Sequence, residues 1–162
     1  MKKTEMKPMD DRAFRDIVGN FCTGVTIITT MNEDLQPIGF TANSFSSLSL
    51  NPKLVLFCID KNASTYKDFM NTPHFAVNIL STNQIDLSKQ FSKRGIDRFE
   101  GVNFSKDVTG SPILNDSLAY LDCKITNYYE GGDHTIVIGE VLSAKATEGK
   151  PLAFFQGKYI DI

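Results

Sequence analysis

Residues 37–59 read PIGFTANSFSSLSLNPKLVLFCI, which is two extended segments separated by a run of small polar side chains. The second segment, residues 54–59, is apolar at every position. A strand of that kind needs cover on both faces, as in a closed barrel or at a subunit interface. The polar run, residues 43–49, contains two apolar side chains, Phe45 and Leu48. This stretch therefore predicts two strands of a β protein with a polar connection between them.

N-terminal to this stretch, the pattern predicts a helix followed by a strand. The helix would be capped by Asp10 or Asp11, and its pattern ends at Gly24. Residues 24–30 are rich in Val, Ile and Thr, which favours a strand. One face of the helix would be apolar, because four apolar residues recur three or four positions apart: Phe14, Ile17, Val18 and Phe21.

C-terminal to this stretch, short strands and short helices follow without regular alternation. About seven short strands with few helices indicate a mostly β fold, with an antiparallel sheet closed into a barrel that leaves no open edge. Ser64 would cap one helix, and residues 131–133 join the last two strands at hairpin spacing. The expected elements are helices over residues 64–71 and 84–91, strands over 75–80, 121–126 and 135–142, and a long loop over 94–115.

Composition limits the classes of protein. The chain has 162 residues, 41% of them hydrophobic, and a formal net charge of −2. This length fits one domain over residues 1–162, with residues 1–8 as a flexible tail. The charge argues against a nucleic-acid surface, and no apolar run approaches the ~20 residues of a membrane helix. Three scattered cysteines and two histidines match neither a disulfide framework nor a metal site. We therefore expect a cytoplasmic protein without metal, nucleic-acid or membrane partners.

Motifs of common catalytic sites are missing. The sequence has no glycine-rich phosphate loop, Rossmann turn or G-x-S-x-G elbow. A nucleophile pair of Cys123 and His134 can be drawn across the last hairpin, but the alternating strand around Cys123 favours a buried thiol. His134 follows a tight turn, so it stands either at the barrel mouth or in solvent. The loop with Lys93, Arg94 and Arg98 either binds phosphate or is an ordinary solvated basic loop.

The main candidate for a binding surface is residues 41–49. Small hydroxyl and amide side chains let backbone N–H groups approach a ligand, and they add hydrogen-bond donors without charge. Such a surface suits a flat ring edged with carbonyls and ring nitrogens. The alternative is a strand edge running into a loop, where Ser, Thr and Asn are common.

A set of stretches along the chain carries a family resemblance. They are MDDRAFR (9–15), TGVTIITT (23–30), TANSF (41–45), SLSLNPKLVL (47–56), FAVNIL (75–80), GDHT (132–135), IGEV (138–141) and FFQGKY (154–159). This ordered set resembles the short-chain flavin reductases, the reductase components of two-component flavin monooxygenases, and is especially similar to the phenol hydroxylase reductase component. The chain departs from the family at Phe40, where methionine or a smaller residue is common, and residues 93–104 do not align cleanly.

The resemblance implies an FMN-binding split β-barrel with a few short helices, which forms a homodimer with the flavin near the subunit interface. It implies a catalytic role for His134, which would face the nicotinamide together with Gly157, Lys158 and Tyr159. It places Arg98 at the flavin phosphate and Ser64 at the phosphate or ribityl chain. The other implied flavin-binding residues are Thr41, Ala42, Asn43, Ser44, Ser47, Leu48, Cys58, Ile59, Asp60, Phe91 and Ser92.

The implied function is an NAD(P)H:flavin oxidoreductase, which transfers a hydride from NADH or NADPH to FMN or FAD and supplies reduced flavin to a partner monooxygenase. Such a transfer depends on stacking and distance more than on an acid or base. Neutral donors around residues 41–47 would stabilise the reduced flavin. The alternatives are a flavin-binding electron carrier without nicotinamide activity and an enzyme similar to pyridoxamine-phosphate oxidase, whose phosphate site needs several basic residues in concert.

Overall fold

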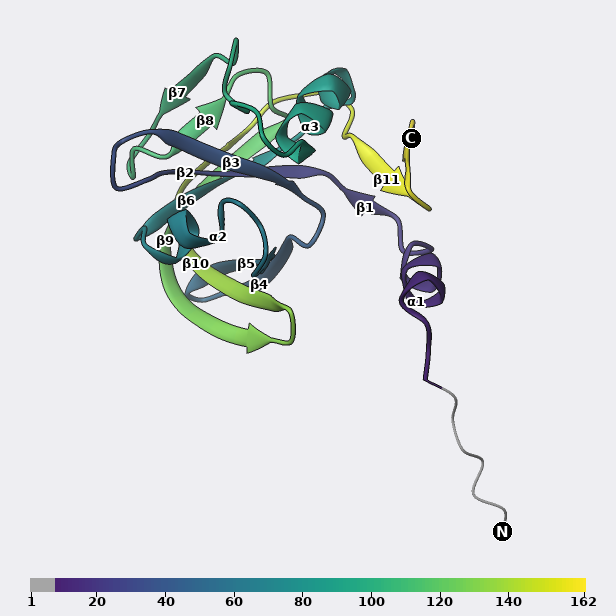
Figure 1. Ribbon diagram of the computed structural model, residues 1–162. Coiled ribbons are helices and arrows are strands. Elements are labelled where there is room, and N and C mark those ends of the chain that lie inside the picture. The colour runs from purple at the N-terminus through teal and green to yellow at the C-terminus, as the bar shows by residue number, and fades with distance from the viewer. Residues whose placement is uncertain (1–7) are drawn as a thin grey trace, which may run out of the picture.

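A strongly curved antiparallel sheet forms the body of the protein (Figure 1). The computed structural model describes residues 8–162, so the tail expected over residues 1–8 lies outside it except for Pro8. The hydrogen-bonded order of the large sheet is β3-β2-β6-β9-β10-β5-β4. Its strands are β2 (Thr26–Met31), β3 (Pro37–Ala42), β4 (Ser46–Leu50), β5 (Lys53–Asp60), β6 (His74–Ile79), β9 (Ala119–Gly131) and β10 (His134–Ala146).

Smaller elements surround this sheet. One short sheet has the order β1-β11-β12, and β7 pairs with β8 in a hairpin. The strands are β1 (Thr23–Gly24), β7 (Phe104–Lys106), β8 (Pro112–Leu114), β11 (Ala153–Phe155) and β12 (Lys158–Ile160); the helices are α1 (Asp11–Val18), α2 (Tyr66–Met70) and α3 (Ile85–Ser92), the last preceded by the 3₁₀ turn η1 (Thr82–Gln84).

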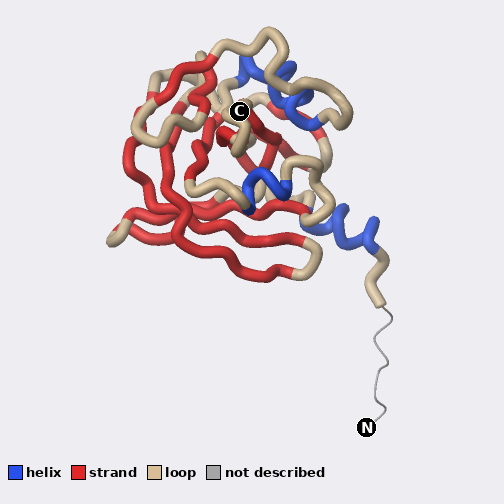
Figure 2. The backbone as a smooth tube through the Cα atoms, turned by 60° about the vertical axis from the view of Figure 1, so that its left-hand side comes forward, coloured by secondary structure: helices blue, strands red, loops and turns tan. Residues whose placement is uncertain are grey.

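The large sheet is not closed by hydrogen bonds, so the closed barrel expected from the sequence is wrong. Its two end strands, β3 and β4, are nevertheless consecutive in the chain and are joined by residues 43–45. Four Cα–Cα steps span at most ~15 Å, so the two ends must lie close together. The sheet therefore curves back on itself without hydrogen bonds between β3 and β4, and Figure 2 shows the curved body from a second direction.

Strand β5 shows why the sheet was expected to close. Val55, Phe57 and Ile59 point into the core, where Phe57 and Ile59 are fully buried. Leu56 and Cys58, on the opposite face, are only half-buried. A single chain therefore buries only one face of β5.

Helix α1 stands away from the large sheet (Figure 1). Asp10 caps its first turn, as expected, by accepting a hydrogen bond from the N–H of Arg12 at 2.8 Å. The helix ends at Val18 rather than near Gly24, because the side-chain amide of Asn20 donates to two carbonyls of the last turn. No residue of α1 is buried, so its predicted apolar face is open. No helix within residues 8–162 is long and apolar enough to cross a membrane.

Several local expectations also need correction. Thr65, not Ser64, is the N-cap of α2, and its side chain makes no capping hydrogen bond. The stretch 24–30 is divided between two sheets, since β1 pairs with β11 and β2 pairs with β3 and β6. The loop expected over residues 94–115 contains β7 and β8. The strands β4, β11 and β12 were not expected as separate elements.

Two apolar clusters fill the curved sheet, and one of them depends on a glycine. Phe57, Phe69 and Phe75 are fully buried, and their rings meet edge to face with centroids 4.9–5.8 Å apart. The Phe75 ring lies against Gly139 of β10, where an added Cβ would come within 2.5 Å of it. Because this core is close-packed, position 139 has no room for a side chain.

Gly139→Ala is expected to lower the free energy of unfolding by about 1–3 kcal/mol through overpacking against Phe75. Urea unfolding of the purified variant measures this change. Gly24→Ala is the matched control, because a Cβ there would meet no atom within 4 Å. Equal midpoints for the two variants would contradict this packing.

Candidate active site

A groove of about 1170 Å³ lies between helix α1 with the residues after it, the C-terminal segment and the connection from β3 to β4. Asn43 and Ser44, in the connection from β3 to β4, line one side of it together with Cys58 at the end of β5. Gly157, in the turn between β11 and β12, lines it from the C-terminal segment. The structure thus brings together four predicted site residues that are far apart in the sequence.

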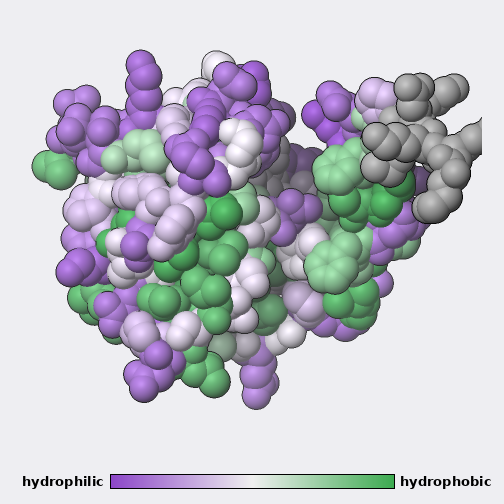
Figure 3. All heavy atoms as spheres, turned by 90° about the horizontal axis from the view of Figure 1, so that it is seen from below, coloured by the Kyte–Doolittle hydropathy of each residue, from purple (hydrophilic) through white to green (hydrophobic). Residues whose placement is uncertain are grey.

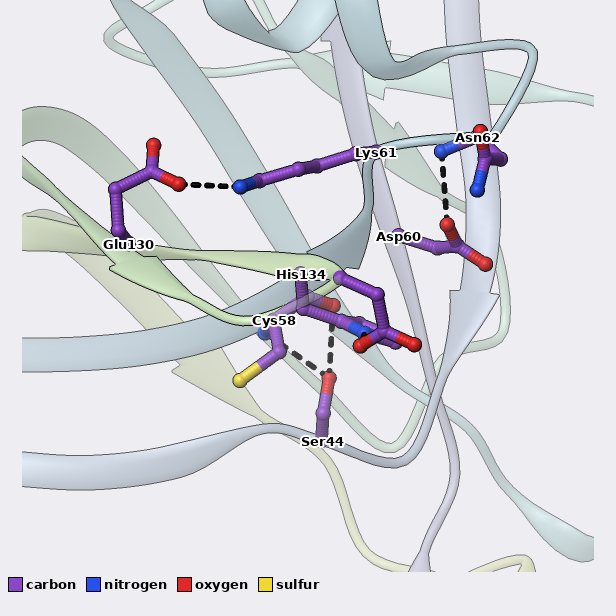
Figure 4. A network of polar contacts seen from close by, with 8 residues as sticks. Ser44, Cys58, Asp60, Lys61, Asn62, Glu130 and His134 are labelled. Carbon is purple, nitrogen blue, oxygen red and sulfur yellow. Dashed lines mark hydrogen bonds and ion pairs between the residues drawn. The ribbon is translucent and has the colours of Figure 1, made fainter. Parts of the chain in front are cut away.

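Ser44 links the connection between β3 and β4 to strand β5 through hydrogen bonds. Its hydroxyl accepts a hydrogen bond from the N–H of Cys58 and donates one to the carbonyl of the same residue, both at 3.0 Å (Figure 4). Burial raises the pKa of the Cys58 thiol, which therefore stays protonated and neutral. This wall of the groove offers polar groups without charge.

A second hollow, of about 180 Å³, lies beside the groove and shares Asn43 with it. Thr41, Ser92 and Tyr159, all predicted site residues, line this hollow together with Ser88. Strand β3, helix α3 and strand β12 therefore meet at one point.

Ser88 is the polar residue of this hollow that the sequence did not indicate. It is fully buried on α3; its carbonyl accepts from the hydroxyl of Thr41 at 2.6 Å, and its hydroxyl shares a 2.8 Å hydrogen bond with that of Tyr159. Its spacing from Phe91 could have indicated a buried helix face. Nothing in the local sequence indicates partners 47 and 71 positions away.

Ser64 and Arg98 line a third hollow, of about 390 Å³, beside β3. The Arg98 guanidinium donates to the carbonyls of Gly39 and Lys93, each at 2.8 Å. Burial, and secondarily the nearby Arg94, lowers the pKa of Arg98. The basic loop is therefore partly anchored rather than fully solvated.

His134 begins β10 at the end of the β9–β10 hairpin, and its Cα pairs with that of Asp60 across the sheet. Its Nδ1 lies 2.7 Å from Oδ1 of Asp133. This hydrogen bond lowers the pKa of Asp133, which is therefore a carboxylate near neutral pH. Figure 4 shows His134 beside the end of β5, near the Ser44–Cys58 contact.

The pair of Cys123 and His134 does not form. Cys123 pairs with Val141, seven residues along β10 from His134, which is roughly 23 Å of strand. Cys123 is fully buried, and burial raises the pKa of its thiol to about 12. The buried-thiol interpretation is confirmed.

Other predicted residues lie outside the three hollows. Ile59 and Phe91 are fully buried in the two apolar clusters, so their side chains have no surface to offer a ligand. Ala42 is 8% exposed, and the half-buried Asp60 accepts a hydrogen bond from the N–H of Asn62. Three further residues are exposed on β4 and β12: Ser47, Leu48 and Lys158.

The groove also has a wall that the sequence did not indicate. Helix α1 and the residues after it supply Phe14, Arg15 and Phe21 to its lining. This segment is held to the β11–β12 turn because the N–H of Gln156 donates to the carbonyl of Gly19 at 2.9 Å. The wall therefore faces the Asn43–Ser44 connection.

Comparison with known proteins identifies the family. The sequence pattern of the flavin reductase like domain matches residues 18–162. The chain belongs to this family. The resemblance noted in the sequence, the mostly β fold and flavin as the cofactor are therefore confirmed, and the protein is a flavin reductase, an oxidoreductase.

Individual relatives agree with this assignment. The reductase subunit HsaB of a flavin-dependent monooxygenase from Mycobacterium tuberculosis is 41% identical over 157 residues, 95% of this chain and 83% of the relative. The structure of flavin reductase PheA2 has a TM-score of 0.86 at 44% identity, covering 95% of this chain and 99% of that one. The Streptomyces globisporus NADH:FAD oxidoreductase SgcE6, with NAD and FAD fragments, has a TM-score of 0.89 at 36% identity, covering 97% of each chain.

Ser88→Ala and Tyr159→Phe each remove one side of the Ser88–Tyr159 hydrogen bond. Each variant of this flavin reductase is expected to lower the kcat/KM for flavin reduction about threefold to tenfold, because Tyr159 loses its contact with α3. The double variant will be no worse than the worse single one, because both lose the same contact. Steady-state kinetics measures these values, with Tyr129→Phe as a control on an exposed tyrosine. Independent, additive losses would show that the contact does not act as a unit.

Proposed function

We propose that this flavin reductase transfers a hydride from NADH or NADPH to FMN or FAD in the groove beside residues 43 and 44. The observation that carries the proposal is the groove itself, which joins the Asn43–Ser44 connection, the end of β5 and the Gly157 turn. Its volume of about 1170 Å³ is larger than that of a typical single-ligand pocket. Two stacked rings therefore have room in it.

The chemistry of the lining fits a flavin. Thr41, Asn43 and Ser44 supply neutral polar groups to the groove and the hollow beside it. Neutral donors suit the carbonyl and nitrogen edge of the isoalloxazine ring. The third hollow, with Ser64 and the partly free guanidinium of Arg98, would receive the phosphate end. The polar groups of residues 41–44 therefore fit the ring of the cofactor, while the third hollow adds Asp68 and Asp97 to Ser64 and Arg98.

The flavin and the nicotinamide supply the hydride chemistry when bound. The protein's residues would bind and orient the flavin and the nicotinamide, and they would exclude water from them. Ser44 holds the ring-binding connection against β5, while Phe14 and Phe21 give the opposite wall apolar surface. Positioning of this kind can contribute up to ~7–11 kcal/mol to catalysis.

We further propose that the protein works as a homodimer, whose two copies complete the family's split barrel. On α1, Ile17 is 57% exposed, and it is not among the residues that line the groove. On the outer face of β5 and β10, Leu56 and Ile138 pair across the strands and are only half-buried. Apolar surface appears both on the body and on the protruding segment in Figure 3. A second copy would cover both areas.

The name of one relative supports a role as the reductase subunit of a monooxygenase. HsaB is the reductase subunit of a flavin-dependent monooxygenase. We propose by analogy that this protein supplies reduced flavin to a partner monooxygenase. A cytoplasmic location, where reduced nicotinamides are available, fits that role.

Anaerobic mixing of the purified protein with flavin and a reduced nicotinamide tests the reaction. We expect NADH or NADPH to bleach the flavin absorbance of FMN or FAD. We also expect the variant His134→Ala to have a raised nicotinamide KM, with a smaller loss of flavin binding. A yellow protein that a protein donor reduces but neither nicotinamide does would instead be an electron carrier. Equal losses of flavin and nicotinamide binding in His134→Ala would contradict the role of His134.

Light scattering tests the homodimer. The wild-type protein should have twice the 18.0 kDa mass of one chain, and the double variant Ile17→Asp, Ile138→Asp should be a monomer, because charged side chains would have to be buried in the interface. Val108→Asp is the control, since Val108 is 65% exposed in a loop away from both areas. A monomeric wild-type protein would contradict the proposal.

A further inference from the structure

The groove and the two smaller hollows lie along one strand. Gly39 lines the third hollow and Thr41 the second, while Asn43, just after β3, lines both the second hollow and the groove. Alternate residues of a strand share a face, so these three positions follow one another along the same side of β3. Four residues of strand span roughly 13 Å. A flavin whose ring lies at Asn43 would therefore extend its ribityl chain past Thr41 toward the third hollow.

The third hollow contains hydrogen-bond donors that are not used. Thr65 lines it and is only 8% exposed, and its hydroxyl has no hydrogen-bond partner within residues 8–162. The guanidinium of Arg98 has five N–H groups, of which two donate to the carbonyls of Gly39 and Lys93. The oxygens of a phosphate group in the hollow would give both side chains the acceptors that they lack.

The same hollow carries more negative than positive charge. Asp68, on α2, and Asp97 line it, and Arg98 is the one cation among the described residues of its lining. Asp97 accepts a hydrogen bond from the N–H of Phe99 at 3.0 Å, and neither carboxylate forms an ion pair in the described part of the chain. Two carboxylates beside one guanidinium disfavour a ligand group with two negative charges.

This charge distinguishes FMN from FAD. The phosphate of FMN is a terminal monoester, with a charge of about −1.5 to −2 at neutral pH. In FAD the same phosphate is bonded to a second one, so each carries a single charge, and the ribose of adenosine follows. Ribose hydroxyls donate hydrogen bonds to carboxylates, as in dinucleotide-binding folds. The hollow, of about 390 Å³, is within the ~300–1,000 Å³ range of pockets for a small ligand, so it has room for more than one phosphate.

We propose that the third hollow selects FAD over FMN. Arg98 and Thr65 bind the diphosphate there, and Asp68 and Asp97 accept hydrogen bonds from the ribose of adenosine. This inference rests on the proposed function, in which the flavin ring lies in the groove and its phosphate end reaches this hollow. The two carboxylates are then specificity-determining residues, which weaken binding of FMN and strengthen binding of FAD.

Calorimetric titration with three flavins, in the absence of any nicotinamide, tests the selection. Riboflavin lacks the phosphate and reports on the ring site, FMN adds the monoester, and FAD adds the diphosphate and adenosine. We expect the wild-type protein to bind FAD about tenfold more tightly than FMN. The double variant Asp68→Asn, Asp97→Asn should lower this ratio about threefold to tenfold, because a neutral amide does not repel the monoester.

Two further variants make the test specific. Glu100→Gln is the matched control for the single variant Asp97→Asn, because Glu100 is an exposed carboxylate of the same segment that does not line the hollow. It should leave the ratio of FAD to FMN affinity unchanged. Thr65→Val should weaken binding of both FMN and FAD relative to riboflavin, since the variant lacks the hydroxyl donor.

The outcomes separate this inference from the proposed function. Equal affinities for FAD and FMN, or a ratio that the double variant does not lower, overturn the selection while hydride transfer stands. A raised KM for NADH in the double variant, with an unchanged flavin ratio, also overturns it, because the hollow would then hold the adenosine end of the nicotinamide donor. A wild-type protein that reduces no flavin with NADH or NADPH overturns the proposed function, whatever the flavin ratio.

Discussion

Three residues, 43–45, join the two end strands of the seven-stranded sheet, and this short connection determines the rest of the architecture. Because β3 and β4 cannot separate by more than the length of the connection, the sheet must curve until its ends nearly meet. Ser44 then fastens the connection to β5 through two hydrogen bonds to the backbone of Cys58. The binding groove lies between this connection, the C-terminal segment and the segment of helix α1, and Asn43 and Ser44 line it where the chain crosses from one end of the sheet to the other.

The side of the groove that the connection and β5 form carries no charged group. Cys58 is kept neutral by burial, and Asn43 and Ser44 carry no charge. Charged side chains lie elsewhere: Arg15 and Asp16 on the α1 wall of the groove, Arg98 beside the third hollow, and Asp133 with His134 at the hairpin. This separation suits a reaction in which the cofactors carry the electrons and the protein orients them.

Sequence patterns were most informative where one short stretch determines the structure. The apolar run at 54–59 predicted β5, and Asp10 predicted the start of α1. The closed barrel was wrong because hydrogen bonding between β3 and β4 depends on the geometry of their connection, which composition does not reveal. The end of α1 was missed because the capping amide of Asn20 lies two residues beyond the helix.

The sequence likewise predicted only part of the site, because a short motif locates residues without showing which way their side chains face. The family motifs located Asn43, Ser44 and Gly157, which the fold brings to one groove. The motifs did not distinguish residues that face the ligand from residues that face the core; the alternation along β5 already places Ile59 on the buried side with Phe57. Ser88 has no local signal, because its partners come from β3 and β12.

A crystal structure of the protein with FMN bound tests the central claim most directly. The account predicts the isoalloxazine ring in the groove, with its polar edge within hydrogen-bond distance of the backbone or side chains of residues 41–44. A ring bound elsewhere, with residues 43 and 44 left in solvent, would contradict it.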